Sequence, residues 1–334
     1  MSEQRVDRLV EHLFRRQAGA MVSALTRIFG RDQLDLIEDV VQDVLIKALE
    51  KWPYTGIPER PTAWLVRTAK NRAIDLFRRS NRFAKCQQLL REWEIPESNP
   101  ERAYSENQIG DDILCMMFMC CHPTLPSSGR TALALKTVAG LSVSEIASAF
   151  MTQELTIAQR IVRAKQLIRT ERILFELPER EELPFRLDSV LEVLYLWFNA
   201  GYLAPEGEQL IRIDVSEEAI RLCRVIVGHE ATGLPKCHAL LALMLLQAAR
   251  FPTRIDGEGK LLLLRDQDRS KWDRVKIMQG LHHLGLSAGG KELTSYHVQA
   301  RIAACHTMAP SYEETDWETI LVTGQPEALF SPRR

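Results

Sequence analysis

Side chains that can pair with DNA bases gather in the stretch LSVSEIASAFMTQELTIAQRIVRAKQLIRT, residues 141–170. Ser142 and Glu145 have the spacing of a capping box, and Thr156 and Gln159 repeat it, which predicts a second helix from about residue 157 to 169. At helical spacing, one apolar stripe of this helix must face a core: Ile157, Ile161, Ala164 and Ile168. The side chains away from that stripe are polar or basic: Thr156, Gln159, Arg160, Arg163, Lys165, Gln166 and Arg169. The pattern predicts a helix-turn-helix with a cationic face.

The polar side chains of the second helix suit two different parts of DNA. In the major groove Gln can pair with adenine and Arg with guanine, and the first turns of such a helix reach the base edges. We therefore expect Gln159 and Arg163 to contact bases, with Thr156 and Arg160 beside them. Lys165 and Arg169 lie on the flanks and are better placed for phosphates.

A second candidate surface is acidic. Residues 32–50, DQLDLIEDVVQDVLIKALE, hold six acidic residues and one lysine, and still carry an apolar core stripe: Leu34, Ile37, Val41, Val44 and Ala48. A separate face carries one apolar and four polar side chains: Asp35, Asp39, Gln42, Asp43 and Ile46. A solvated acidic face is the ordinary interpretation. The functional alternative is a docking face for a basic partner helix, with Ile46 as its apolar anchor.

A third candidate surface is basic and aromatic. Between Arg60 and Lys85 there are eight basic residues and one acidic residue, with three aromatic residues interleaved. Nine residues in and before this helix form the candidate surface: Trp52, Tyr54, Arg60, Trp64, Arg67, Lys70, Asn71, Arg78 and Arg79. Aromatic rings stack on unpaired bases and arginines neutralise phosphates. The alternative is a cationic surface with Trp64 half-buried. A loop over residues 51–61, stiffened by prolines, is expected to precede it.

Helices must position all three surfaces. Amphipathic helical periodicity covers almost the whole chain and period-two alternation is scarce, so the expected fold class is all-α. The expected parts are a block over 5–90, a linker over 91–107, a block over 108–173, a third block over 185–322 and a tail over 323–334. A linker of roughly 15 residues spans up to about 50 Å, more than the ~34 Å of one turn of DNA.

Composition excludes several classes of protein. The net charge of −1 over 334 residues argues neither for nor against a nucleic-acid partner. Seven cysteines without C-x-x-C pairing, no signal peptide and no apolar run long enough for a bilayer predict a cytoplasmic protein with reduced thiols and no membrane partner. The CCHP sequence at 120–123 is better explained by buried thiols than by zinc. In the absence of catalytic or nucleotide-binding motifs, we expect no enzymatic activity, cofactor or metal.

Taken together, these segments resemble the sigma-70 family of bacterial RNA polymerase sigma factors, in its extracytoplasmic-function (ECF) group. IEDVVQDVLIKALEKW is similar to region 2.2, PTAWLVRTAKNRAIDLFRR to regions 2.3 and 2.4, and the helix-turn-helix to region 4. The third block contains LYLWFNAGY, DQDRSKW and AACH and resembles the helical, tetratricopeptide-like C-terminal extension of one ECF branch.

The resemblance implies a sigma factor that directs promoter-specific transcription initiation. It implies that Asp39, Gln42 and Asp43 dock on the β′ clamp helices of core RNA polymerase, and that the β flap is a further contact of the polymerase. It also implies that residues 52–61, Trp64 and Asn71 melt and contact the −10 element of promoter DNA, and that residues 156–165 contact the −35 element. A regulatory protein or ligand at the C-terminal part is a further expected partner. The rival is a stand-alone helix-turn-helix regulator whose third block senses a ligand or dimerises.

Overall fold

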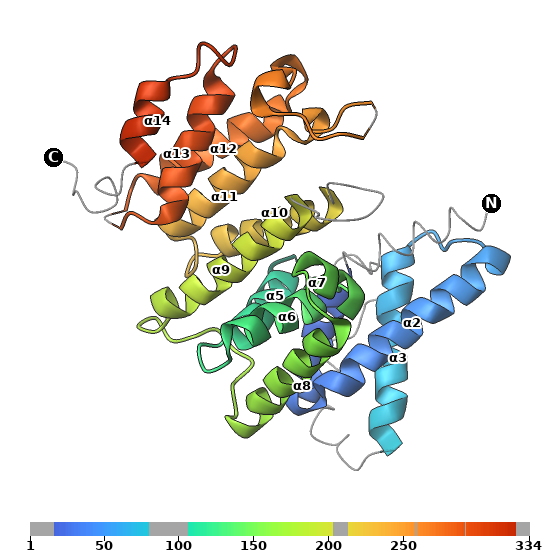
Figure 1. Cartoon of the computed structure of the whole chain (residues 1–334). Helices are drawn as coiled ribbons and strands as arrows, with labels where there is room; N and C mark the ends of the chain where they lie inside the picture. The colour runs from blue at the N-terminus through green and yellow to red at the C-terminus, as the bar shows by residue number, and fades with distance from the viewer. Residues whose placement is uncertain (1–16, 80–105, 203–212, 258, 291, 325–334) are drawn as a thin grey trace. The chain divides into compact units, whose positions relative to one another are not determined.

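The computed structural model describes residues 17–79, 106–202, 213–257, 259–290 and 292–324 (Figure 1). The described residues are helices joined by turns, without a β-strand, and one isolated bridge joins Ile255 to Leu261. The all-α fold class expected from the periodicity is confirmed. None of the described helices is both long and apolar enough to cross a membrane. The chain divides into two compact units, residues 1–190 and 191–334.

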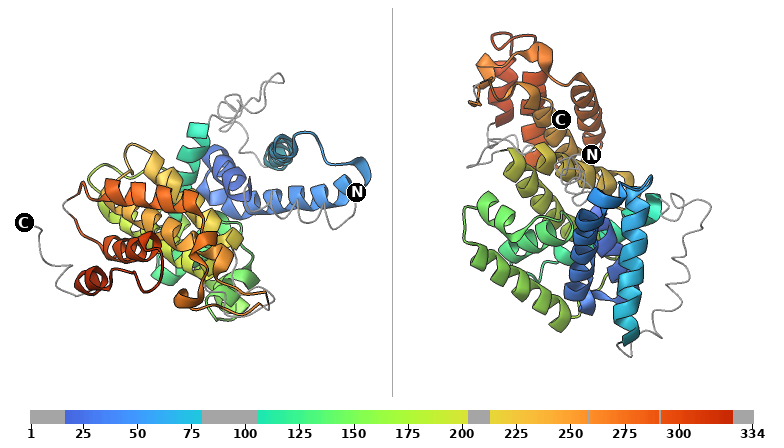
Figure 2. Two further views of the ribbon diagram at one scale, coloured as in Figure 1. Left: turned by 90° about the horizontal axis from the view of Figure 1, so that it is seen from above. Right: turned by 90° about the vertical axis from the view of Figure 1, so that its right-hand side faces the viewer.

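The first unit begins with four helical segments: residues 17–29, η1 (Arg31–Gln33), α2 (Leu34–Thr55) and α3 (Pro61–Arg79). Helices α2 and α3 pack against each other, as the views in Figures 1 and 2 agree. The apolar stripe expected on α2 is buried along its whole length. Phe29 stacks on Phe77 of α3 with ring centroids 4.0 Å apart, which ties residues 17–29 to this pair of helices.

Helix α2 is longer than expected. A loop was predicted over residues 51–61, but α2 continues through Pro53 to Thr55, so the loop prediction is wrong for residues 51–55. Gly56 ends the helix with φ of 80°, a conformation that glycine adopts without steric strain, and its N–H donates to the carbonyl of Trp52 at 3.0 Å. Trp52 therefore stands on the last turns of a helix, where its side chain is buried.

Four more helices follow in the first unit: α5 (Glu106–Cys120), α6 (Ser127–Thr137), α7 (Val143–Ala149) and α8 (Glu154–Thr170). The linker predicted over 91–107 lies outside the described residues, except that its last two residues belong to α5. Cys120 and Cys121 are buried, as predicted, and burial raises the pKa of the Cys120 thiol well above its ordinary value. Helix α8 packs on both α6 and α7.

The two expected helix starts have different outcomes. Ser142 caps α7, because its Oγ accepts from the N–H of Glu145 at 3.1 Å and the Glu145 carboxylate accepts from the N–H of Ser142 at 2.7 Å. The predicted start of α8 is wrong: the helix begins at Glu154 after Gln153, and no side chain caps it. Thr156 therefore lies inside the first turn. The apolar stripe of α8 is nevertheless buried as predicted: Ile157, Ile161, Ala164 and Ile168.

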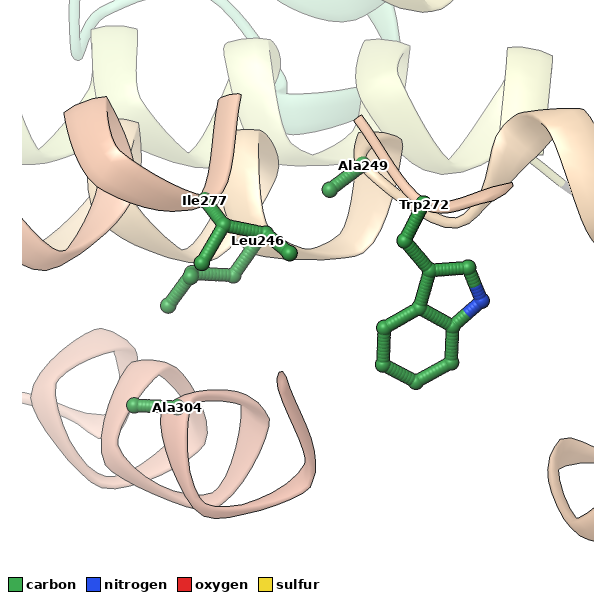
Figure 3. Close-up of a cluster of buried hydrophobic side chains, with 5 residues drawn as sticks. All are labelled: Leu246, Ala249, Trp272, Ile277 and Ala304. Atoms are coloured by element: carbon green, nitrogen blue, oxygen red, sulfur yellow. The ribbon is translucent and has the colours of Figure 1, made fainter. Parts of the chain in front are cut away.

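Helix α9 (Leu183–Tyr202) begins in the first unit and ends in the second. The other helices of the second unit are α10 (Ile213–Gly228), α11 (Pro235–Ala248), η2 (Phe251–Thr253), η3 (Leu264–Asp266), η4 (Arg269–Lys271), α12 (Arg274–Ser287), α13 (Ser295–Met308) and α14 (Trp317–Gly324). Helix α11 is central, since it packs against α10, α12 and α13. Figure 3 shows one of its clusters, formed by Leu246, Ala249, Trp272, Ile277 and Ala304.

The motifs of the third block hold the second unit together. Arg269, in DQDRSKW, is buried and donates to the carbonyl of His306, in AACH, at 2.6 Å. Arg254 lies 3.6 Å from the ring centroid of Tyr202, the last residue of LYLWFNAGY, and donates to its carbonyl at 2.7 Å. Asp268 caps η4, because its side chain accepts from the N–H of Ser270 at 3.0 Å. These contacts give the motifs a structural role within their own unit.

Candidate nucleic-acid interface

Helix α8 presents a polar face away from its core stripe. Gln159, Arg163 and Gln166 are exposed, and Thr156 and Arg160 are half-buried at the edges of the same face. The buried stripe fixes the rotation of the helix, so these side chains point outward. The base-pairing donors expected from the sequence are therefore accessible in this structure.

Two apolar side chains lie on the same face and were not singled out from the sequence. Leu155 is 66% exposed and Val162 is 62% exposed. Seven residues separate them, close to two helical turns, so they lie on one side of α8. Leu155 was missed because it precedes the predicted start of the helix. The sequence signal that could have identified Leu155 and Val162 is their position outside the buried stripe. Apolar side chains on such a face can contact the methyl group of thymine.

The basic flank of α8 is paired within the chain. Lys165 Nζ lies 2.7 Å from Asp35 Oδ1 and 2.9 Å from Glu38 Oε2, and Arg169 Nη1 lies 3.1 Å from Asp35 Oδ2. Burial would lower the pKa of Lys165, but Glu38 and Asp35 hold this pKa above its ordinary value. Burial would raise the pKa of Asp35, but Lys165 and Arg169 hold it below its ordinary value. The two residues expected at phosphates therefore contact carboxylates of α2.

The acidic face of α2 is divided between exposed and paired side chains. Asp39, Gln42 and Ile46 are exposed, and their spacing puts them on one side of the helix. Asp43 accepts from Arg72 of α3 at 3.2 Å, across a partly exposed pair. Asp35 contacts α8 and Asp43 contacts α3. The other three of the five expected docking residues form a continuous accessible face.

The basic face of α3 exposes Arg67 and Asn71, with Trp64 and Lys70 half-buried. Arg60 is exposed just before the helix. The arrangement can offer a ring edge, an amide and guanidinium groups to a nucleic-acid strand. The side chains of Arg78 and Arg79 lie outside those that the structure describes.

Trp52 and Tyr54 are placed very differently. Trp52 is buried and packs edge-on against Trp64, with ring centroids 5.5 Å apart. Trp52 therefore packs behind Trp64 of α3 in the interior of the unit. The predicted exposure of Trp52 to unpaired bases is not observed. Tyr54 is 90% exposed near the end of α2 and remains accessible.

Comparison with known proteins identifies the N-terminal part. Residues 13–83 match the Sigma-70 region 2 family, and residues 186–288 match a family of unknown function, DUF6596. Over 301 residues the chain is 39% identical to an uncharacterized protein of Rhizobium meliloti (strain 1021), an alignment that covers 90% of this chain and 70% of that protein. No solved structure matches the chain.

Region 2 is a domain of sigma factors, so residues 13–83 of this all-α chain carry a domain of a class of proteins that act in transcription initiation. The chain belongs to the same family as the uncharacterized Rhizobium protein, and its residues 13–83 match Sigma-70 region 2. Helices α2 and α3 lie within the matched region 2, whereas α8 lies outside it.

Proposed function

We propose that this chain is an ECF-type sigma factor that docks on core RNA polymerase, contacts the −35 element and captures unpaired bases of the −10 element. The observation that carries the proposal is the presence of two accessible and chemically different faces in one unit. Asp39, Gln42 and Ile46 offer an acidic face with an apolar centre on α2. Gln159 and Arg163 offer base-pairing groups on α8.

The docking role rests on charge and exposure. A basic partner helix would meet the acidic side chains around Ile46, whose exposed apolar side chain supplies the kind of anchor found at the centre of protein interfaces. The sigma-70 region 2 match covers this face, and the β′ clamp helices of core polymerase are the proposed partner. The β flap of core polymerase is the proposed partner of the segment that contains α8.

The DNA roles divide between two helices. The α8 face is proposed to enter the major groove, where Arg163 and Gln159 contact bases and Thr156 and Arg160 support them. The α3 face, with Trp64, is proposed to hold unpaired bases by stacking while its arginines meet phosphates. The chain has no catalytic step in this scheme, because polymerase performs the chemistry.

The rival function is a stand-alone regulator that binds duplex operators without polymerase. Such a protein has no use for an accessible acidic face beside its DNA-binding helix, so the α2 face favours the sigma-factor proposal. A C-terminal unit that binds a regulatory protein or ligand is compatible with either function.

Run-off transcription with core polymerase on a set of candidate promoters tests the proposal directly. Asp39→Arg should weaken binding to core polymerase at least tenfold, roughly the effect of about 1.4 kcal/mol. Glu179→Arg is the control, because it makes the same change of charge at an exposed residue outside α2, α3 and α8. Normal binding of Asp39→Arg, or duplex operators bound equally well without polymerase, would favour the rival.

Base contact by α8 is tested separately. Arg163→Ala should lower affinity for the preferred −35 sequence by roughly 1 to 3 kcal/mol and relax its specificity. Arg180→Ala removes the same charge from an exposed position outside α8 and should leave specificity unchanged. An equal loss of affinity for every −35 variant would reduce α8 to a phosphate-binding helix.

A further inference from the structure

The centre of the exposed face of α8 combines apolar and amide side chains. A helix advances about 100° per residue, so the positions opposite the buried stripe follow from the sequence numbers. Four exposed side chains lie there within about 60° of one another: Leu155, Gln159, Val162 and Gln166. We call these four residues the central face.

Packing on the buried side of α8 holds the helix in this rotation. Gly129 of α6 lies beside α8, because a Cβ on Gly129 would be 3.6 Å from the Cβ of Ala164. The segment after α6 is itself closely packed, since Gly19 approaches the carbonyl oxygen of Val138 so closely that a Cβ on Gly19 would not fit. The central face is therefore presented outward by a packed support.

The charge around the central face favours DNA over a protein as its occupant. Residues 155–170 include four basic residues and no acidic residue. Two of the four basic residues, Arg160 and Arg163, lie on the same side of α8 as Gln159. A DNA duplex carries phosphates along both edges of its major groove, so it meets such a helix with the opposite charge.

An amide between two apolar side chains matches the major-groove edge of A·T base pairs. Adenine offers N7 and N6–H₂ to an amide, and thymine offers its C5-methyl group to an apolar side chain. Along the helix axis Gln159 is about 6 Å from Leu155 and about 4.5 Å from Val162, and stacked bases are about 3.4 Å apart. An adenine at Gln159 can therefore have a thymine near each apolar side chain. A cytosine in place of thymine would bury its N4–H₂ donors against an apolar group without a hydrogen bond.

We propose that Leu155 and Val162 are specificity-determining residues, which select thymine in the −35 element by contact with its C5-methyl group. Gln159 between them binds adenine, and Arg163 at the edge of the face is left for guanine. The inference rests on the proposed function, which brings α8 to the −35 element. It adds which base pairs the centre of the helix selects.

Uracil is the probe for this contact, because deoxyuridine pairs with adenine as thymidine does and lacks only the C5-methyl group. Selection from random-sequence duplexes by the full chain with core polymerase first gives the enriched −35 sequence. That duplex is then made with thymine or with uracil in the −35 element only, and the Kd of each is measured. The uracil duplex should bind about threefold to fourfold more weakly for each thymine in contact, the usual effect of burying one methyl-sized group.

Variants locate the contact. Leu155→Ala and Val162→Ala should each bring the ratio of the two Kd values close to one at one thymine, whereas Leu155→Met keeps an apolar side chain and should retain most of the ratio. Leu174→Ala is the matched control, because Leu174 is also exposed but follows the end of α8, and it should leave the ratio unchanged. Each ratio is taken within one variant, so it does not depend on the folded fraction of that variant.

The outcomes separate this inference from the proposed function. Equal affinity of the parent chain for the thymine and uracil duplexes would overturn the thymine contact and leave −35 binding intact. If Leu155→Ala weakened binding to core polymerase in the absence of DNA and kept the parent ratio, the central face would be a protein-docking surface and the inference would be wrong. Absence of any enriched sequence, with or without core polymerase, would refute the sigma-factor proposal and the inference with it.

Discussion

Trp52 and Tyr54 belong to the same turn of α2 but lie in opposite environments. Trp52 is buried against Trp64, and its Nε1–H has no hydrogen-bond partner among the described residues. Tyr54 has its ring in solvent. A buried ring contributes to stability through packing, whereas an exposed ring is available to a ligand.

Substitutions at these two residues should therefore have different effects. Trp52→Ala should lower the free energy of unfolding by about 3 to 5 kcal/mol, because it leaves a large cavity. Tyr54→Ala should change it by less than about 0.5 kcal/mol. Urea denaturation of the full chain measures both.

Trp52→Phe is the matched control, since it keeps an aromatic ring and removes the unpaired N–H. It should cost clearly less stability than Trp52→Ala. If Tyr54→Ala lowered the free energy of unfolding as much as Trp52→Ala does, the assignment of Trp52 to the core and of Tyr54 to the surface would be contradicted.

The sequence predicted which polar side chains of α8 are exposed better than it predicted the burial of single aromatic residues. Gln159 and Arg163 could be assigned to an exposed face because the stripe that contains Ile157 and Ile161 determines the rotation of the helix. The burial of Trp52 could not be predicted, because it depends on α2 continuing past Pro53 and on the neighbouring Trp64. Leu155 was missed for a related reason, since its helical position depends on where α8 begins.

At the scale of elements, the start of α7 and the start of α8 differ in their capping. Ser142 makes the reciprocal contacts of a capping box. Thr156 lies in the first turn of α8 after an N-cap residue, Gln153, that makes no side-chain cap contact. Only Ser142 satisfies a backbone N–H that would otherwise lack an acceptor.

Alanine substitutions distinguish the two starts. Ser142→Ala should lower the free energy of unfolding by about 1 kcal/mol, the usual contribution of a capping residue. Thr156→Ala should leave stability unchanged or raise it by up to about 0.7 kcal/mol, because alanine favours a helix interior. Thermal unfolding of both variants is the measurement, and a greater loss at Thr156 would contradict the observed start of α8.

Helical periodicity predicted the faces of α2 and α8 because it is repeated over several turns. The start of α8 was mispredicted because a T-x-x-Q pattern is only four residues long and occurs inside helices as well as at their ends. The next possible start, at Gln153, carries no comparable signature.

At the scale of the whole molecule, the second unit has its own internal support. Arg269 donates to the carbonyls of His306 and Ala309 and to the hydroxyl of Thr315. These contacts hold η4 to α13 and to the segment that follows it, all within residues 191–334. The core of Figure 3 lies in the same unit.

Arg269→Ala should destabilise the second unit by roughly 3 kcal/mol or more, since a hydrogen bond to a charged group typically contributes roughly 1.5 to 3 kcal/mol. Arg265→Ala removes an exposed arginine from neighbouring η3 and should have little effect. In calorimetry of the full chain, Arg269→Ala should lower one of two transitions and leave the other in place. A single transition that shifts as a whole would contradict independent unfolding of the two units.

The all-α class and the helical third block were predictable, because they depend on local periodicity. The contact between Lys165 and Asp35 was not, since the two residues are 130 positions apart and both had been assigned to outside partners on the basis of their charge. Charge alone does not reveal whether a lysine meets a phosphate or a carboxylate of its own chain. The division into blocks over 5–90 and 108–173 stays a prediction.

The close approach at Gly19 has an evolutionary consequence. The backbone of residues 17–29 and the carbonyl of Val138 leave no room for a methyl group. A single-base change from a glycine codon to an alanine codon would therefore loosen the packing of residues 17–29 on the segment after α6 without altering any charge. Lineages can thus adjust the stability of the first unit at one uncharged position and leave the charged faces of α2, α3 and α8 unchanged.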